Sequence, residues 1–283
     1  EINITEKNTD IRNYKTLYNI ISDVKPDIIF HLAAQPLVRD SYDEPKYTFD
    51  INVMGTVHVF EAIRNLGIST KIVNVTTDKV YENIEQNVSY KESDPLGGYD
   101  PYSSSKACSE IISASYKKSF FEQGKVLLAT SRAGNVIGGG DWSKDRLIPD
   151  IVRAKMNNQT LEIRNPKSIR PWQHVLDSIS GYLRVGQLLL QNEGKAASNW
   201  NFGPTDDSCV SVQEMLDEYR KYHAIDNVIY NLANDRKHEA VLLKLDCTKA
   251  NFELNWKPVW NLNQAAEKTA SWYAKFMLDN SAK

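Results

Sequence analysis

Three short apolar runs rich in β-branched residues alternate with segments that carry a helical pattern. The runs cover residues 27–34, 71–76 and 126–133, a length that favours buried strands over buried helices. Helices are predicted at about 17–24, at 47–66 and from residue 102 onward, with Phe49, Val53, Val57 and Phe60 facing inward on the second. Because strands that alternate with helices form parallel sheets covered on both faces, the sequence predicts an α/β fold.

The pattern changes after Gly140, where shorter elements are separated by prolines. Ser211 and Glu214 have the spacing of a capping box, which predicts a helix to about residue 223, and a last helix is predicted over about 262–277. We therefore expect two domains. Residues 1–145 form a nucleotide-binding domain, and residues 146–283 form mainly a smaller α+β substrate domain, with segments that return to the first.

Composition excludes several classes of function. The net charge of −2 gives no reason to expect binding to nucleic acid or to a membrane surface. No apolar stretch approaches the about 20 residues that a membrane helix needs. The three cysteines are far apart, which suits a reducing cytoplasm, and no two of the five histidines have metal-ligand spacing. We expect a cytoplasmic protein without a metal site.

Thr77, Asp78 and Lys79 follow directly on the run at 71–76. Polar residues that follow a parallel strand lie at the carboxyl edge of the sheet, where α/β proteins place their ligands. A hydroxyl, a carboxyl group and an amine at this point indicate a catalytic site. The alternative interpretation is an ordinary polar exit from a strand.

Tyr102 and Lys106 lie four residues apart on the helix that Asp100 and Pro101 are predicted to begin. An ammonium near a phenol stabilises the phenolate, so we expect Lys106 to lower the pKa of Tyr102 toward that of a general base. The alternative is a surface lysine on an amphipathic helix. Tyr42 and Lys46 have the same spacing, but Pro45 separates them and prevents one helix from carrying both.

Together these motifs resemble the extended short-chain dehydrogenase/reductase family, and within it the sugar-nucleotide 4,6-dehydratases. The resemblance covers nearly the whole chain, through DIRN at Asp10, HLAAQPLVR at His31, NVMGT at Asn52, TTDKVY at Thr76, GGYDPYSSSK at Gly97, RAGNVIGGGDW at Arg132, RLIPDI at Arg146, IRNPKSIRPWQHVLD at Ile163, NFGP at Asn201 and LKLDCTKA at Leu243. Lys79 stands where most of these dehydratases carry glutamate, which points to the branch that acts on CDP-glucose. The resemblance implies a Rossmann-like, doubly wound parallel sheet, bound NAD and a role in surface polysaccharide synthesis.

The resemblance also implies which residues contact the two ligands. It assigns NAD contacts to Asp10, Ile11, Ala33, Ala34, Asn52, Tyr102 and Lys106. It assigns the sugar-nucleotide pyrophosphate to Asn135 and Arg170, and the nucleobase to Arg146, Leu147 and Pro149. For the last three an ordinary helix start is the alternative, and the Asn52 amide could instead join neighbouring strand ends.

The catalytic roles implied by the resemblance follow from the chemistry of water loss. Oxidation of carbon 4 of the glucose acidifies the proton on carbon 5, after which the carbon-6 hydroxyl leaves and hydride returns to carbon 6. Tyr102 is the expected base for the carbon-4 hydroxyl, with Thr77 bonded to the same oxygen. Lys79, or Tyr102 with Lys79 as relay, takes the carbon-5 proton, and Asp78 is the acid for the departing hydroxyl.

One departure from the family leads to further expectations. The family begins with a strand, a glycine-rich turn and a second strand, and this sequence contains no such glycine motif. We expect a fragment of a longer protein that lacks the first strands of its sheet and binds NAD poorly. A 4-epimerase, another dehydratase of the same fold and an inactive relative without cofactor remain alternatives. The resemblance also implies a homo-oligomer.

Overall fold

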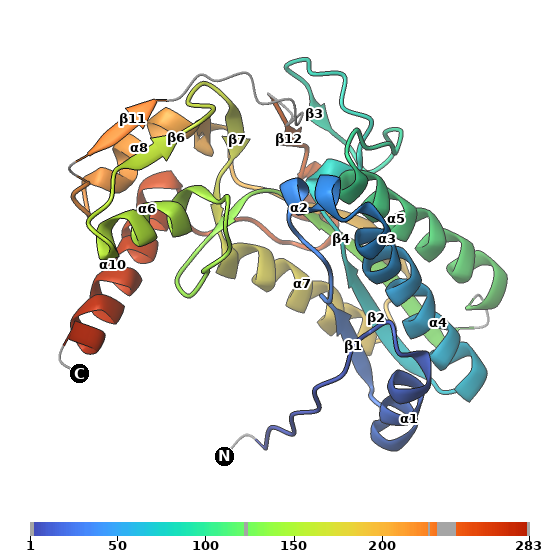
Figure 1. The fold of residues 1–283 in the computed structure, drawn as a ribbon. Coiled ribbons are helices and arrows are strands. Elements are labelled where there is room, and N and C mark those ends of the chain that lie inside the picture. Colours follow the sequence, from blue (N-terminus) through green and yellow to red (C-terminus); the bar gives the residue numbers. More distant parts are fainter. Residues whose placement is uncertain (1–2, 122–123, 226, 231–241, 282–283) are drawn as a thin grey trace.

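The computed structural model describes residues 3–121, 124–225, 227–230 and 242–281 (Figure 1). Its main sheet has four parallel strands in the order β1-β2-β4-β9. These strands are β1 (Ile28–His31), β2 (Thr70–Val75), β4 (Val126–Ala133) and β9 (Asn199–Phe202). The three strands expected from the apolar runs are present, although β1 is shorter than its run, so the predicted α/β fold is confirmed.

Helices cover both faces of this sheet. They are α1 (Tyr14–Val24), α2 (Val38–Asp43), α3 (Pro45–Phe49), α4 (Gly55–Leu66), α5 (Pro101–Phe120) and α7 (Val175–Leu190). Successive side chains of a strand point to opposite faces. On β2, Ile72 packs in one core with Phe60 of α4, whereas Val73 packs in another with Val185 of α7. Figure 1 shows α4 and α5 on one side of the strands and α7 on the other.

The helix predicted over 47–66 is interrupted by a π turn at Asp50–Met54, between α3 and α4. A π turn adds one residue to a helical turn, so the inward positions before it shift by one. Phe49 was predicted to face inward but is 36% exposed, and Thr48 is fully buried in its place. Asn52, within the turn, and Thr56, after it, are also buried. The predicted inward face is therefore wrong before the turn, while Phe60 after it is buried as expected.

A second core lies beside the sheet and is built from shorter elements. They are α6 (Leu147–Met156), β6 (Leu161–Ile163), β7 (Ile169–Pro171), β10 (Cys209–Ser211), α8 (Val212–Arg220), β11 (Val228–Tyr230) and α10 (Leu262–Ser281). Strand β6 pairs with β11 and β7 pairs with β10. The capping box of Ser211 and Glu214 is formed, although α8 ends at Arg220 rather than near residue 223. Ile151, Met215 and Tyr273 pack together in this core.

The remaining strands are short, and the remaining helix packs in the core of the main sheet through Ala250. They are β3 (Ser89–Tyr90), which pairs with β12 (Lys244–Leu245), β5 (Val136–Ile137), which pairs with β8 (Gln173–His174), and α9 (Thr248–Glu253). Helix α7 and strand β9 belong to the main sheet although they follow residue 146 in the chain. The division at residues 145 and 146 remains a prediction. Across the described part of the chain, no helix combines the length and the apolar character needed to span a bilayer.

Candidate active site

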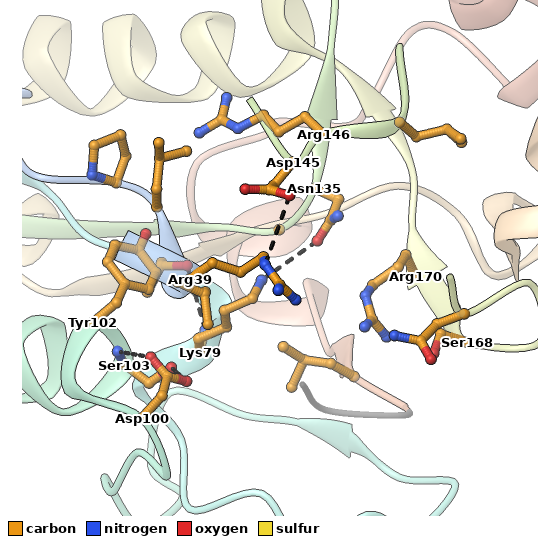
Figure 2. Close-up of a pocket in the computed structure, with 18 of the residues that line it drawn as sticks. Arg39, Lys79, Asp100, Tyr102, Ser103, Asn135, Asp145, Arg146, Ser168 and Arg170 are labelled. Atoms are coloured by element: carbon orange, nitrogen blue, oxygen red, sulfur yellow. Dashed lines mark hydrogen bonds and ion pairs between the residues drawn. The ribbon is translucent and has the colours of Figure 1, made fainter. Parts of the chain in front are cut away.

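A cavity of about 930 Å³ lies between the carboxyl ends of the main strands and the second core (Figure 2). Its lining includes the predicted site residues Thr77, Lys79, Tyr102, Asn135, Arg146, Leu147, Pro149 and Arg170. Asp78 and Lys106 are buried behind this lining. The structure thus brings the predicted catalytic and substrate residues to one place from distant parts of the chain.

The turn after β2 holds three of the predicted catalytic groups. The Thr77 hydroxyl donates to Asp78 Oδ1 at 3.1 Å, and Lys79 Nζ lies 3.2 Å from the same oxygen. Asp78 is fully buried, and no hydrogen-bond partner for its Oδ2 is found among the described residues. A Cβ atom at Gly134 would lie 2.9 Å from this oxygen. Asp78 is therefore fixed by one oxygen and has the other available for a proton.

Tyr102 lies in the first turn of α5, which begins as the sequence predicts. Asp100 caps the helix by accepting from Ser103 N at 2.9 Å, and Pro101 is its first residue. Burial raises the pKa of Tyr102 to about 12, a hydrogen bond with Thr77 opposes the rise, and the charge of Asp78 adds to it. The predicted lowering of this pKa by Lys106 is wrong for this arrangement, because the ammonium is engaged elsewhere.

Lys106 donates to the backbone carbonyl of Val75 at 3.0 Å, at the last residue of β2. Burial lowers the pKa of Lys106 to about 8, and the charge of Glu110 acts in the opposite direction. His31, at the end of β1, is also buried, with Nε2 3.2 Å from the Thr56 hydroxyl. Burial and then the charge of Lys106 lower the pKa of His31 to about 3. Lys106 is therefore bonded to the carboxyl end of β2 and acts electrostatically on a residue at the end of β1.

Lys79 connects the catalytic turn to the opposite wall of the cavity. Its Nζ lies 3.4 Å from Asn135 Oδ1, and its side chain is 24% exposed. Figure 2 shows Lys79 reaching toward Asn135. An amine in contact with both Asp78 and the cavity is placed to exchange protons between a ligand and that carboxyl group.

The opposite wall carries the predicted substrate residues. Arg170 of β7 is buried and donates from Nη1 to the Ile169 carbonyl at 3.0 Å. Arg146 precedes α6 and forms an ion pair of 3.0 Å with Asp141, while Leu147 and Pro149 lie in the first turn of that helix. The helix start given as their alternative is present, and the same residues line the cavity, while their predicted contact with the nucleobase stays a prediction.

Sequence reasoning missed an ion-pair cluster at the cavity. Asp145 lies 2.6 Å from Arg164 and 3.6 Å from Arg39 of α2, and Lys144 pairs with Asp40 at 2.9 Å. Figure 2 shows the contact between Arg39 and Asp145. Arg39 ends the HLAAQPLVR run, which was a signal for its importance. Asp145 lies more than a hundred residues from Arg39 in the sequence, so no local motif could predict that the two would pair.

The predicted cofactor residues near the amino end of the chain lie outside this cavity lining. Asp10 is exposed and pairs with Arg12, whose hydrogen bond lowers the pKa of Asp10 to about 2. The Ile11 carbonyl lies 3.0 Å from His58 Nδ1. Their predicted contacts with adenine stay predictions.

Ala33, Ala34 and Asn52 lie at the carboxyl end of β1. The Asn52 amide accepts from Gln35 N at 2.8 Å and donates to Ser105 at 2.9 Å, so it joins the segment after β1 to helix α5 rather than to a second strand end. Ala33 is exposed and Ala34 is half-buried. Small side chains after β1 leave the backbone accessible, and Lys106 offers an ammonium at the end of the neighbouring strand β2, so these residues fit the ribose of a nicotinamide nucleotide. Elsewhere in the described residues, no cluster of three histidine, cysteine or acidic side chains is arranged to hold a metal ion.

Comparisons with known proteins agree with this site. The family model described as GDP-mannose 4,6 dehydratase matches residues 1–269. The CDP-glucose 4,6-dehydratase of Salmonella typhimurium is 48% identical over 269 residues, covering 93% of this chain and 75% of that protein. The UDP-glucose 4-epimerase of Mycoplasma pneumoniae is 26% identical, covering 92% of this chain and 80% of the relative.

Among solved structures, the dTDP-glucose 4,6-dehydratase DesIV of Streptomyces venezuelae, with NAD and TYD bound, superposes with a TM-score of 0.82. It is 25% identical, and the match covers 95% of this chain and 79% of DesIV. The family expected from the sequence motifs is thereby confirmed. The chain belongs to the GDP-mannose 4,6 dehydratase family of the extended short-chain dehydrogenases/reductases.

Proposed function

We propose that this chain carries the catalytic site of an NAD-dependent hydro-lyase that converts CDP-glucose to CDP-4-keto-6-deoxyglucose. The observation that carries the proposal is the meeting of Thr77, Lys79 and Tyr102 with buried Asp78 at one cavity. The 48% identity to a CDP-glucose 4,6-dehydratase supports the choice of substrate. The reaction removes hydrogen from carbon 5 and hydroxyl from carbon 6 as water, without net oxidation or reduction.

Both ligands have candidate partners in the chain. When bound, NAD would supply the hydride chemistry, as acceptor at carbon 4 and as donor at carbon 6. Tyr102 and Lys106 would hold its ribose, with Ala33 and Ala34 beside it and Asp10 and Ile11 toward its adenine.

For the sugar nucleotide, the Arg170 guanidinium has the fork geometry that matches paired phosphate oxygens. Asn135 would assist at the same pyrophosphate. Arg146, Leu147 and Pro149 would contact the base.

Tyr102 is the proposed base for the carbon-4 hydroxyl. Thr77 is hydrogen-bonded to Tyr102 and also donates to Asp78, so it is placed to orient the reacting oxygen. A phenol with a pKa of about 12 keeps its proton, so ligand binding must lower this pKa before the phenol can act as a base. The positive charge of Arg146 already acts in that direction.

Lys79 and Asp78 are proposed to carry out the elimination. Lys79 takes the proton from carbon 5, directly or as a relay to Tyr102, and the Asp78 carboxyl group protonates the departing carbon-6 hydroxyl. The separation of 3.2 Å between Lys79 Nζ and Asp78 Oδ1 then lets the ammonium return that proton to the carboxylate. As hydride returns to carbon 6, Tyr102 gives carbon 5 the proton that it took from the carbon-4 hydroxyl. Tyr102, Lys79 and Asp78 thus end the cycle in the protonation states in which they began.

Product analysis tests this proposal directly. The protein, with NAD, is incubated in heavy water with the CDP, dTDP, GDP and UDP derivatives of glucose, and products are followed by NMR. We expect a 4-keto-6-deoxy product with solvent deuterium at carbon 5, formed fastest from CDP-glucose. CDP-glucose that carries deuterium at carbon 4 of its glucose should give a product that carries this deuterium at carbon 6. The double substitution Asp78→Asn with Lys79→Ala should abolish water loss.

The main competing function is 4-epimerisation, which the relative from Mycoplasma pneumoniae favours. Epimerisation needs no acid and base to expel water. A galactose product without loss of water, made equally well by the Asp78 and Lys79 double variant, would contradict the dehydratase. We further propose a cytoplasmic homo-oligomer that serves surface polysaccharide synthesis.

A further inference from the structure

A carboxylate with no role in the proposed reaction is buried behind the cavity. Glu110 of α5 is 3% exposed. Its Oε1 accepts from Thr76 Oγ1 at 2.5 Å and from Arg132 Nε at 3.0 Å. Its Oε2 accepts from Thr130 Oγ1 at 2.7 Å and from Arg132 Nη2 at 2.8 Å. Both oxygens are thus fully engaged.

Glu110 lies one helical turn after Lys106, so the two side chains leave α5 on the same face. Lys106 binds the Val75 carbonyl and Glu110 binds the hydroxyl of the next residue, Thr76. Thr77 follows immediately. Two charged groups of one helix therefore hold the end of β2 just before the catalytic turn.

The other end of the same turn is held by the partner of Glu110. Arg132 of β4 is 1% exposed, and its Nη1 donates to the Tyr81 hydroxyl at 2.8 Å. Tyr81 directly follows the 3-10 turn Asp78–Val80, and its own hydroxyl donates to Asn201 Oδ1 at 2.7 Å. The ion pair of Glu110 with Arg132 is therefore bonded to the residues on both flanks of the segment 77–80.

We propose that Glu110 and Arg132 are positioning residues, which keep Thr77, Asp78 and Lys79 in reach of Tyr102 by fixing both ends of their turn. A buried ion pair is a weak source of net stability, because the loss of hydration offsets its attraction. A geometric role accounts better for its bonds to Thr76 and Tyr81. The kinetic part of this inference rests on the proposed function, whereas its structural part does not.

Two matched substitutions separate positioning from packing. Thr76→Val and Thr130→Val each remove one hydroxyl that donates to Glu110, from buried threonines of the same size. Only Thr76 adjoins the catalytic turn. We expect Thr76→Val to raise amide hydrogen exchange over residues 76–81 and to lower kcat about 10-fold with little change in KM. Thr130→Val should change both quantities less than about 2-fold.

A third variant tests the arginine without removing its charge. Lysine cannot reproduce the fork with which Arg132 reaches both Glu110 and Tyr81. Arg132→Lys should therefore raise exchange over the same residues and lower kcat by at least about 10-fold.

Equal effects of Thr76→Val and Thr130→Val, or unchanged exchange over 76–81 in both Thr76→Val and Arg132→Lys, would overturn the inference. Exchange is measured without substrate. An error in the proposed reaction would therefore leave that result intact.

Discussion

The two sides of the cavity hold their charged groups in different ways. On the catalytic side Asp78, Lys106 and Glu110 are at most 7% exposed, and Lys106 and Glu110 are bonded to Val75 and Thr76 at the end of β2. On the opposite wall the paired side chains of Asp145 and Arg164 are 25% and 38% exposed. Buried charged groups are held in place by their protein partners. Exposed ion pairs are screened by water and salt and contribute little free energy. Changes on the catalytic side should therefore act on kcat, and changes on the wall on KM.

The largest effect is expected from Lys79→Met, which removes an amine that contacts Asp78. Loss of a positioned base or relay should slow water loss by about 10²- to 10⁴-fold, with KM changed far less. NMR of the product measures the rate, and exposed Lys155 provides a control for loss of a lysine. Water loss at close to the parent rate would make Lys79 a spectator and Tyr102 the first candidate for the carbon-5 base.

A smaller effect is expected from Gly134→Ala, which tests how closely Asp78 is held. The added Cβ would lie 2.9 Å from Asp78 Oδ2 and 2.8 Å from Pro171 Cγ, so the carboxyl group must move. We expect kcat to fall by about 10- to 100-fold. Gly194→Ala is the control, since nothing lies within 4 Å of its Cβ position. Equal kcat values for the two variants would show that Asp78 tolerates displacement.

The pH dependence of the free energy of unfolding tests whether His31, on the catalytic side, is as deeply buried as the structure shows. Its pKa is about 3 in the folded state and 6.5 as the ordinary value, so the unfolded state binds more protons between these pH values. The free energy of unfolding should therefore rise with pH across that window, by up to about 1.4 kcal/mol per unit, and level off above it. Urea unfolding from pH 4.5 to 7 measures this slope. His31→Gln should flatten it, and an unchanged slope would mean that His31 does not cause it.

The smallest effect is expected on the wall, from Asp145→Asn. The change removes the charge that pairs with Arg164 and Arg39, both of which line the cavity. Partly exposed pairs contribute little, so KM should change only about 2- to 5-fold and kcat less than that. The change in KM should shrink at high salt. A large, salt-independent loss of kcat would remove the distinction between the two sides.

Local patterns predicted much of the fold and the site. The strand runs, the start of α5 at Asp100 and the capping box at Ser211 each depend on neighbouring residues, and each is present. Family motifs predicted eight of the residues that line the cavity, whereas the predicted cofactor residues Asp10, Ile11, Ala33, Ala34 and Asn52 lie outside that lining.

Features that depend on contacts between distant parts of the chain could not be predicted from the sequence. The π turn is stabilised by Asn52 bonding to Gln35 and Ser105, which no periodic pattern records. The pKa of Tyr102 was expected to fall because Lys106 is one turn away in the helix. The direction is reversed because burial dominates and the lysine binds the Val75 carbonyl instead.

The π turn at Asp50–Met54 also limits how the length of this chain can vary. Removing one residue there would restore an ordinary helix, with every later position keeping its face. Thr48 would stay buried and keep its 2.8 Å bond from the Gln35 side chain, whereas Asn52, inside the turn, would lose the geometry of its bonds to Gln35 and Ser105. A single deletion at this point should therefore leave both flanking helices in place and act only through the lost contacts of Asn52.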